Sequence, residues 1–351
     1  MLKLKGGYAF KSEKFQDSGV PVVRISNLPQ NSYSVDLSDC VYYECGNYQN
    51  YTVKNGDLLI AMSGATTGKT AIYRYDYPAY LNQRVGLFAP KELVHNQFLY
   101  PIVESKTFIS QLGSKLVAGA QPNISSQDIE TIAVGLPSKE EQIKIAHLFE
   151  LLNQKIETQS KIIEEQETLL KSLADKLFLQ NNHSCQLSEL VNIEKGKQLN
   201  ADTLSETGDY YVMNGGITPS GYYSEYNVPA GAISISEGGN SCGYVQFNEK
   251  PFWSGGHCYS LQCRTNLVDY KYIYYYLKTK EADVMALRIG SGLPNIQKKD
   301  IEKFTITYPS LQLQKQFVKA LDALSGKINT EKNLLEKYCQ QKSYLLSQMF
   351  I

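Results

Sequence analysis

The sequence contains no long hydrophobic run, no paired-cysteine motif and no excess of either charge. Its apolar runs fall well short of the roughly 18 residues of a membrane span, and no apolar signal region follows the opening Met1–Lys5. We therefore expect a cytoplasmic protein without membrane contact. The seven cysteines are an odd number and none forms Cys-x-x-Cys, which indicates reduced thiols rather than a disulfide framework or a zinc site.

The absence of net charge limits how the chain could bind nucleic acid. Lysine and arginine number 35, and aspartate and glutamate also number 35. A protein that binds nucleic acid alone usually has a basic excess. Any function on DNA therefore implies either a weak attraction to phosphate or an attraction that a partner supplies. Tyrosine is abundant, with 26 residues, and its ring and hydroxyl suit partly hydrated binding surfaces.

Motifs of catalysis are also missing. The sequence has no Asn-Pro-Pro-Tyr/Phe, no Gly-x-Ser-x-Gly and no His-Glu-x-x-His, and its four histidines are scattered. The segment Gly64–Thr70 is similar to a phosphate-binding loop, but it has one residue too few between Gly64 and Gly68, and strand-like residues follow it. We predict no catalytic residue, no metal site and no cofactor. A nucleotide-hydrolysing enzyme that uses this loop is the alternative.

An internal repeat is the main signal in the sequence. Residues 121–178 align with residues 293–350 without a gap. The matches include Pro122-Asn123-Ile124 with Pro294-Asn295-Ile296, Asp128-Ile129-Glu130 with Asp300-Ile301-Glu302, Pro137-Ser138 with Pro309-Ser310, Gln142 with Gln314, and Phe178 with Phe350. The chain is therefore two copies of one unit, over about 1–178 and 179–351. Each copy has a Gly- and Tyr-rich stretch of predicted strands, then short helical segments and a long helix.

The long helices carry a heptad repeat, which is typical of coiled-coil packing. In the first helix the heptad residues are Ile145, Phe149, Leu152, Ile156, Gln159, Ile163, Gln166, Leu170, Leu173 and Leu177, and in the second they are Phe317, Leu321, Leu324, Ile328, Glu331, Leu335, Tyr338, Lys342, Leu345 and Met349. We expect the polar members Gln159, Gln166, Glu331 and Lys342 to determine the register. The alternative is an amphipathic helix that lies on a globular core. A helix of about 40 residues is about 60 Å long, too long for that, so we expect the two helices to pack on each other.

The predicted fold is α+β, with two similar domains related by a pseudo-two-fold axis and joined by two long antiparallel coiled-coil helices. The predicted division places the first domain at 1–137, the first helix at 138–180, the second domain at 181–309 and the second helix at 310–351.

This arrangement resembles the specificity subunit of Type I restriction–modification systems, over essentially the whole chain. The segments that carry the resemblance are Leu136–Ala146, Gly292–Ile296, Gly56–Gly64 with Gly68-Lys69, and Leu187–Gly196. The first copy departs from the pattern, because Met1–Gly6 keeps the Lys-Gly pair and lacks most of the preceding strand. The resemblance implies two target-recognition domains, each of which reads one half of a bipartite, asymmetric DNA target. It also implies that the helices set the gap between the halves.

The resemblance further implies partners and no chemistry in the chain itself. The expected partners are double-stranded DNA, two methyltransferase subunits and, through the complex, restriction subunits with translocase and nuclease activity. A bipartite scaffold that reads no sequence is a further alternative.

Polar side chains near predicted strand ends and in equivalent loops are the candidates for DNA contact. Arginine can bind guanine through two hydrogen bonds, and asparagine or glutamine can bind adenine in the same way. The candidates are Lys11, Arg24, Ser63, Thr66, Thr67, Lys69, Gln83, Arg84, Lys195, Gln198, Asn214, Asn240, Ser241, Ser254 and His257. For each of them an ordinary solvated surface role is the alternative. His257 with Cys258 and Cys263 has no second ligand pair, so we expect a structural role there rather than a metal site.

Overall fold

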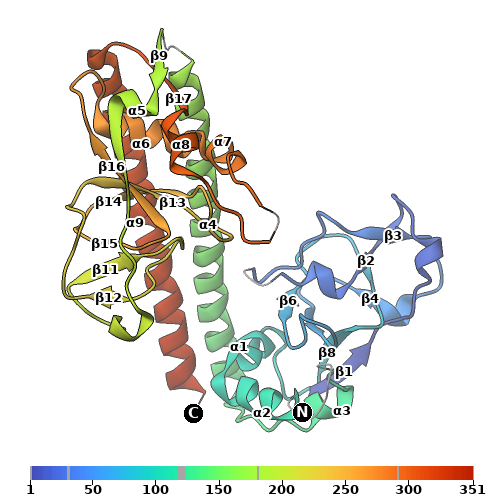
Figure 1. The fold of residues 1–351 in the computed structure, drawn as a ribbon. Coiled ribbons are helices and arrows are strands. Elements are labelled where there is room, and N and C mark those ends of the chain that lie inside the picture. Colours follow the sequence, from blue (N-terminus) through green and yellow to red (C-terminus); the bar gives the residue numbers. More distant parts are fainter. Residues whose placement is uncertain (1, 30–31, 117–122, 180–181, 291, 351) are drawn as a thin grey trace. The chain divides into compact units, whose positions relative to one another are not determined.

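The computed structural model describes residues 2–29, 32–116, 123–179, 182–290 and 292–350, so that Met1, Pro122 and Ile351 lie outside it. The chain divides into two compact units (Figure 1). The first unit comprises Met1–Ile162 and Lys332–Ile351, and the second comprises Ile163–Glu331. Both units mix strands and helices, which confirms the predicted α+β class.

The first unit is built on two four-stranded sheets. Its antiparallel sheet has the order β1-β8-β5-β6, with β1 at Leu2–Gly6, β8 at Val85–Pro90, β5 at Leu58–Ala61 and β6 at Thr70–Ile72. The other sheet has the order β3-β2-β7-β4, with β3 at Val41–Tyr43, β2 at Val20–Val23, β7 at Ala79–Leu81 and β4 at Thr52–Val53. The short helices of this unit are α1 at Leu99–Glu104, α2 at Lys106–Leu116 and α3 at Ser126–Glu130.

The second unit repeats this order of elements. Its antiparallel sheet is β10-β16-β13-β14, with β10 at Val191–Lys195, β16 at Cys258–Cys263, β13 at Ala232–Ser236 and β14 at Val245–Asn248. A three-stranded sheet β12-β11-β15 follows, with β12 at Tyr222–Tyr223, β11 at Tyr210–Met213 and β15 at Trp253–Ser254. The remaining elements are β9 at His183–Gln186, which pairs with β17 at Thr305–Tyr308, and the helices α5 at Leu187–Leu190, α6 at Tyr270–Thr279, α7 at Glu281–Ala286 and α8 at Lys298–Glu302.

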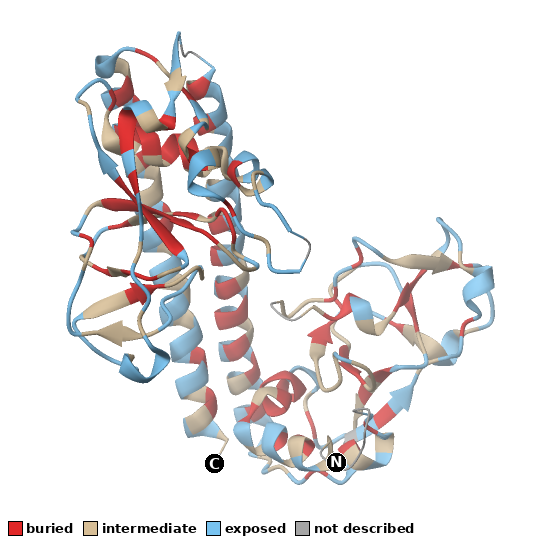
Figure 2. Ribbon diagram, viewed as in Figure 1, coloured by how far each residue is buried: buried red, intermediate tan, exposed pale blue. Residues whose placement is uncertain are grey.

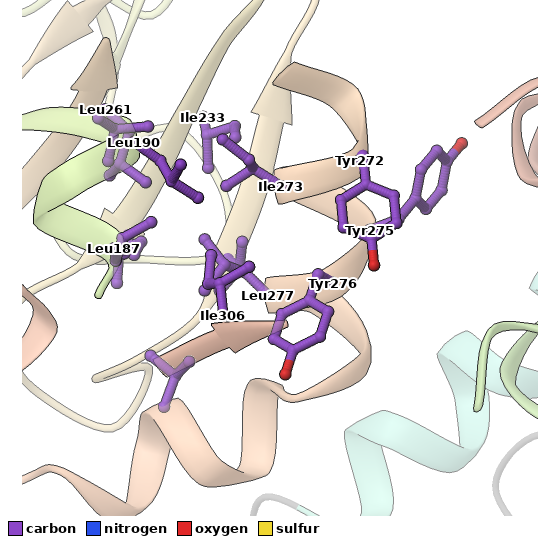
Figure 3. Close-up of a cluster of buried hydrophobic side chains, with 14 of the residues drawn as sticks. Leu187, Leu190, Ile233, Leu261, Tyr272, Ile273, Tyr275, Tyr276, Leu277 and Ile306 are labelled. Atoms are coloured by element: carbon purple, nitrogen blue, oxygen red, sulfur yellow. The ribbon is translucent and has the colours of Figure 1, made fainter. Parts of the chain in front are cut away.

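The core of the second unit lies between its antiparallel sheet and its helices. Figure 3 shows Ile233 and Leu261 from the sheet beside Leu190 of α5 and Ile273 of α6. All four side chains are at most 1% exposed. Burial of large aliphatic side chains on this scale is the main driving force for folding of the unit.

Strand β1 corrects one expectation from the sequence. The opening of the first copy was expected to lack most of its first strand, and this is wrong. Residues Leu2–Gly6 pair with β8 over all five positions, as Val191–Lys195 pairs with β16 in the second unit. The strand forms because its backbone completes a ladder with β8, and Leu4 is buried on the core face. Sequence likeness to the second copy is not needed for that pairing.

The long helices are α4 at Lys139–Phe178 and α9 at Leu311–Met349. In the first unit the ring of Phe350, just after α9, lies 6.4 Å from that of Phe149 near the start of α4. In the second unit Phe178, at the end of α4, belongs to one core cluster with Phe317 near the start of α9. The two helices are therefore antiparallel in each unit, as predicted. Among the described residues no helix is long and apolar enough to span a membrane.

Most heptad positions face inward, and Figure 2 shows buried residues recurring along α4. Each helix also contributes to the core of its unit, because Ala146 belongs to a core cluster of the first and Leu321 to that of the second. The expectation for Met349 is wrong: it is 40% exposed, whereas Leu346 is 8% exposed. A straight helix of 3.6 residues per turn drifts by about 20° per heptad, which moves the apolar face by the last turn.

Candidate nucleic-acid interface

Four segments of the first unit meet at one end of its strands. They are Arg24 after β2, the β5–β6 loop Met62–Lys69, the β7–β8 loop Asn82–Arg84, and Asn123-Ile124 before α3. Backbone hydrogen bonds join them: Asn82 N donates to Val23 O at 3.0 Å, Met62 N to Arg84 O at 2.9 Å, and Ile124 N to Met62 O at 2.8 Å. We call these segments the first loop cluster.

A hollow of about 760 Å³ opens between three of these segments. Its lining includes Ser63, Gln83 and Arg84, which are candidate DNA contacts, together with Asn123. The first loop cluster therefore presents hydrogen-bonding side chains around a shared depression.

The second unit has the same cluster at the equivalent strand ends. Gly255 N donates to Met213 O at 2.8 Å, Glu237 N to His257 O at 2.9 Å, and Ile296 N to Glu237 O at 2.9 Å. These three bonds match those of the first loop cluster one for one. The second loop cluster therefore comprises Asn214 after β11, Glu237–Tyr244, Gly255–His257, and Asn295-Ile296.

The β5–β6 loop is a hairpin connection and not a phosphate-binding loop. Thr67 N donates to Gly64 O at 3.1 Å and Gly68 N to Ala61 O at 2.8 Å. Gly64 and Gly68 have φ of +82° and +87°, which other residues rarely adopt. Strand β6 follows directly and pairs with β5, whereas a phosphate-binding loop leads into a helix. The nucleotide-binding alternative for this loop is therefore wrong.

The equivalent loop of the second unit closes in the same way. Cys242 N donates to Gly239 O at 3.1 Å, and Gly243 N donates to Ser236 O at 2.9 Å. Gly239 and Gly243 have φ of +76° and +91°. The glycine frame is thus shared by both units, as the sequence indicated.

The side chains on this shared frame differ. The matched backbone hydrogen bonds show which residues of the two units are equivalent. Arg24 corresponds to Asn214, Arg84 to His257, and Lys69 to Tyr244. The first loop cluster thus has cationic side chains where the second has neutral or titratable ones. Two sites with one backbone and different hydrogen-bonding groups can discriminate different ligands.

The candidates of the first unit fall mainly within its loop cluster. The hydroxyls of Ser63 and Thr66 are buried and have no hydrogen-bond partner among the described residues. The hydroxyl of Thr67 donates to Gly64 O at 2.6 Å, which stabilises the turn. A guanidinium nitrogen of Arg24 donates to Asp39 O at 3.2 Å. Lys11 is exposed just before the 3₁₀ helix Ser12–Lys14, which is not one of the four segments.

The candidates of the second unit are linked to one another. Lys195 Nζ lies 2.6 Å from Glu237 Oε1, and His257 N donates to Asn214 Oδ1 at 3.0 Å. Gln198 lies against Gly256. A Cβ atom added to Gly256 would be 2.4 Å from Oε1 of Gln198.

Three further candidates of this unit differ in exposure. Asn240 is exposed and Ser241 is half-buried in the hairpin loop. Ser254 is 1% exposed, and its hydroxyl donates to Cys258 O at 3.3 Å. The geometry favours a structural role for Ser254, and its contact with DNA stays a prediction.

Reasoning from the sequence did not single out Glu237 as a candidate residue. This carboxylate is buried beside Lys195, His257 and the hydroxyl of Tyr259. Burial, together with the hydrogen bond to Glu237, raises the pKa of Tyr259 well above its usual value, so the hydroxyl remains a donor. The available signal was an acidic residue directly after an apolar strand, at the repeat position of Met62. In the described part of the chain, no group of three or more His, Cys, Asp or Glu side chains could hold a metal ion.

Comparison with known proteins identifies the family. The model of the Type I restriction modification DNA specificity domain matches residues 1–168 and 181–337. A Mycoplasma pneumoniae protein that is named as a type I specificity subunit is 34% identical over 152 residues, which are 43% of this chain and 40% of that protein. The Type I restriction enzyme MjaVIII specificity subunit of Methanocaldococcus jannaschii is 28% identical over 184 residues, 51% of this chain and 43% of its own length.

These alignments span less than half the length of either curated relative. A solved structure covers more of the chain: the S subunit of a Type I restriction–modification system from M. genitalium matches with a TM-score of 0.73 at 20% identity. The match covers 100% of this chain and 94% of that one, and it shows a shared fold. The family model covers both copies of the repeat, and the chain therefore belongs to the Type I restriction modification DNA specificity domain family, with two such domains in tandem.

Proposed function

We propose that the chain is the DNA-sequence-specificity subunit of a Type I restriction–modification complex. Each loop cluster reads one half of a bipartite, asymmetric target. The observation that carries this proposal is the pair of loop clusters with matching backbone hydrogen bonds and different side chains. Two readers built on one frame suit a target with two unlike halves, because base identity is read by side chains at base edges.

The chemistry of the candidates supports different preferences in the two halves. In the first loop cluster, Arg84 can bind the O6 and N7 atoms of guanine, and Gln83 can bind adenine. In the second, Asn214 has the same capability toward adenine, although its Oδ1 already accepts from the backbone of His257. Lys11, Lys69 and Lys195 suit phosphate contacts, which position a protein without reading sequence.

We propose further that the chain performs no chemistry and acts through partners. These are double-stranded DNA, two methyltransferase subunits, and restriction subunits with translocase and nuclease activity. The zero net charge supports a role for such partners, because a neutral subunit needs other proteins to attract the DNA phosphates. The name of the M. jannaschii relative refers to a restriction enzyme, which is consistent with such a complex.

The long helices are the proposed docking surface for the methyltransferases and the spacer between the half-sites. In the first unit, Ile143, Leu148 and Leu151 of α4 are 47%, 40% and 46% exposed. Leu148 and Leu151 are three residues apart and are therefore neighbours on the helix surface, and exposed large apolar side chains of this kind favour a protein partner.

Mapping of methylated bases in genomic DNA tests the proposal. Cells that express the chain with a methyltransferase subunit of this system should methylate one bipartite motif, and cells that express the methyltransferase alone should not. Methylation without sequence preference would favour the scaffold alternative. A chain that methylates or cleaves DNA without partners would contradict the proposal.

A further inference from the structure

Glu237 is a buried carboxylate of the second loop cluster, and it lies beside the exposed side chains of Lys195 and His257. Its side chain is 5% exposed, whereas those of Lys195 and His257 are 53% and 60% exposed. Its Oε1 accepts from Lys195 Nζ at 2.6 Å and from the hydroxyl of Tyr259 at 2.9 Å. Its Oε2 is buried, has no hydrogen-bond partner among the described residues, and lies 3.7 Å from Nδ1 of His257.

The first unit shows that the fold does not need this charge. Met62 has the backbone position of Glu237: each donates its N–H to the neighbouring loop, at Arg84 O and His257 O respectively. An apolar side chain is therefore compatible with the frame. A buried carboxylate destabilises a protein unless it is paired and hydrogen-bonded. Because the fold does not need this charge, its contacts at the surface of the loop cluster explain its presence better.

We infer that Glu237 is a positioning residue for DNA reading by the second loop cluster. This inference rests on the proposed function. The carboxylate holds the ammonium of Lys195 at the rim, and its Oε2 lies 3.7 Å from Nδ1 of His257, within reach of an ion pair with the protonated ring although too far for a hydrogen bond. The opposite ring nitrogen, Nε2, then faces outward, as an acceptor on the neutral ring or a donor on the protonated ring.

One carboxylate thus orders two side chains from different strands of the sheet. Lys195 ends β10, and His257 directly precedes β16. Both are long or rotatable and well exposed, so without Glu237 each would sample several rotamers and lose directional contact with a base or phosphate. The first loop cluster has no such arrangement, because Met62 cannot accept a hydrogen bond of this strength.

Selection from a pool of random-sequence DNA duplexes tests this role. The full chain, in complex with its methyltransferase partner, should enrich a bipartite motif. Glu237→Gln should lower base preference in one half by about tenfold and leave the other half unchanged. Glu249→Gln removes the same charge from an exposed residue at the opposite end of the β13–β14 ladder, and should leave both halves unchanged.

Two further variants keep the test decisive if Glu237→Gln folds poorly. Glu237→Met carries the residue of the first unit, and Lys195→Met/Glu237→Met removes both charges so that neither is left unpaired. Both should lose preference in the same half. In the Glu237→Met background, Lys195→Met should add less than about twofold, because the two residues act together.

The outcomes separate the inference from the proposed function. A wild-type complex that enriches no motif overturns both. A wild-type motif that persists unchanged in both halves in the folded Glu237 variants overturns the inference alone. A purely structural role would lower the thermal midpoint and the amount of DNA bound without altering base preference, and that result also overturns it.

Discussion

Gln142 and Gln314 make the same three hydrogen bonds, one set in each unit. The side-chain oxygen of Gln142 accepts from His95 N at 2.8 Å. Its amide nitrogen donates to Leu93 O at 3.1 Å and to Pro137 O at 3.0 Å. The residue is 2% exposed. Its three hydrogen bonds join the first turn of α4 to the domain that precedes it.

Gln314 repeats the pattern at the start of α9. Its side-chain oxygen accepts from Asp269 N at 2.8 Å, and its amide donates to Leu267 O at 3.4 Å and Pro309 O at 2.8 Å. The residue is fully buried. The repeated glutamine of the sequence is therefore a structural link between helix and domain.

We predict that Gln142→Leu or Gln314→Leu lowers the free energy of unfolding by about 2–4 kcal/mol. Each substitution leaves one buried N–H and two carbonyls without a partner, and an unsatisfied buried group costs about 1–3 kcal/mol. Urea unfolding of the purified chain measures the effect. The control is Gln316→Leu, at an exposed position of α9. It should change the free energy of unfolding by less than about 0.5 kcal/mol. A loss below about 1 kcal/mol for both buried variants would contradict the prediction.

Lys342 was expected to determine the register of the helix pair, and the structure pairs it with α1. Its Nζ lies 2.6 Å from Glu104 Oε2 and 3.7 Å from the ring centroid of Tyr33, and its side chain is 6% exposed. We predict that replacing both partners, in the double variant Glu104→Leu/Lys342→Met, changes stability little or raises it by about 1–4 kcal/mol, because it removes the desolvation penalty of both charges. Glu104→Leu should instead destabilise by about 3–5 kcal/mol, because it leaves the ammonium buried alone. Equal losses from both variants would show that the pair is net stabilising.

The same lysine predicts a pH dependence. Burial lowers the pKa of Lys342 in the folded state, against the opposing effect of Glu104. Above that lowered pKa the unfolded chain holds the proton more tightly than the folded chain does. The contribution of Lys342 to the free energy of unfolding therefore rises with pH until the unfolded pKa of about 10.4 is passed. Between pH 7 and about pH 10, the free energy of unfolding should rise more for the wild type than for Lys342→Met.

Arg84 and Lys69 should have different effects on DNA binding. If Arg84 contacts a guanine, Arg84→Ala should relax preference at one position of one half-site, by about 1–3 kcal/mol. If Lys69 contacts phosphate, Lys69→Ala should weaken binding to all sequences alike and reduce the slope of log affinity against log salt by about one. Equilibrium binding at several salt concentrations separates the two. An Arg84→Ala variant that weakens all duplexes equally would reassign that residue to phosphate.

Replacement of residues 187–292 by the recognition domain of another family member should change one half of the methylated motif. The other half should stay as it was, because the first loop cluster is untouched. Methylated sites in genomic DNA provide the measurement. A motif altered in both halves would mean that the two loop clusters do not read independently.

Helix length should determine the gap between the half-sites. Insertion of seven residues into each long helix, near Gln159 and Glu331, preserves the heptad and lengthens each helix by about 10 Å. With about 3.4 Å of DNA per base pair, the preferred gap should grow by about three base pairs. The accompanying rotation of the second half-site along the duplex, by roughly 100°, acts against this shift.

A two-residue insertion into one helix alone is the control for the longer insertion. It rotates the apolar face away from its partner and should weaken assembly. A stable, active seven-residue variant that methylates only the original spacing would show that another feature sets the distance.

The sequence alone determined the repeated organisation of the chain. Heptad spacing, the Pro-Ser pair before each long helix and the glycines of the hairpin loops are local patterns, and local backbone preferences act on neighbours in the chain. The match of Gln142 with Gln314 was visible in the sequence, although its three hydrogen bonds were not. The candidate residues around Arg84 and His257 were found for the same reason, since they follow strands at equivalent places.

Only the tertiary structure decided which polar groups are buried and what they contact. Glu237 meets Lys195 because β10 and β13 both pair with β16, and Lys342 meets Glu104 across 238 residues of sequence. The burial of Ser254 also depends on segments remote in the chain, such as Asn227, which accepts from its N–H at 2.6 Å. Desolvation and pairing of a polar group are set by everything that surrounds it in space, and a one-dimensional pattern does not contain that information.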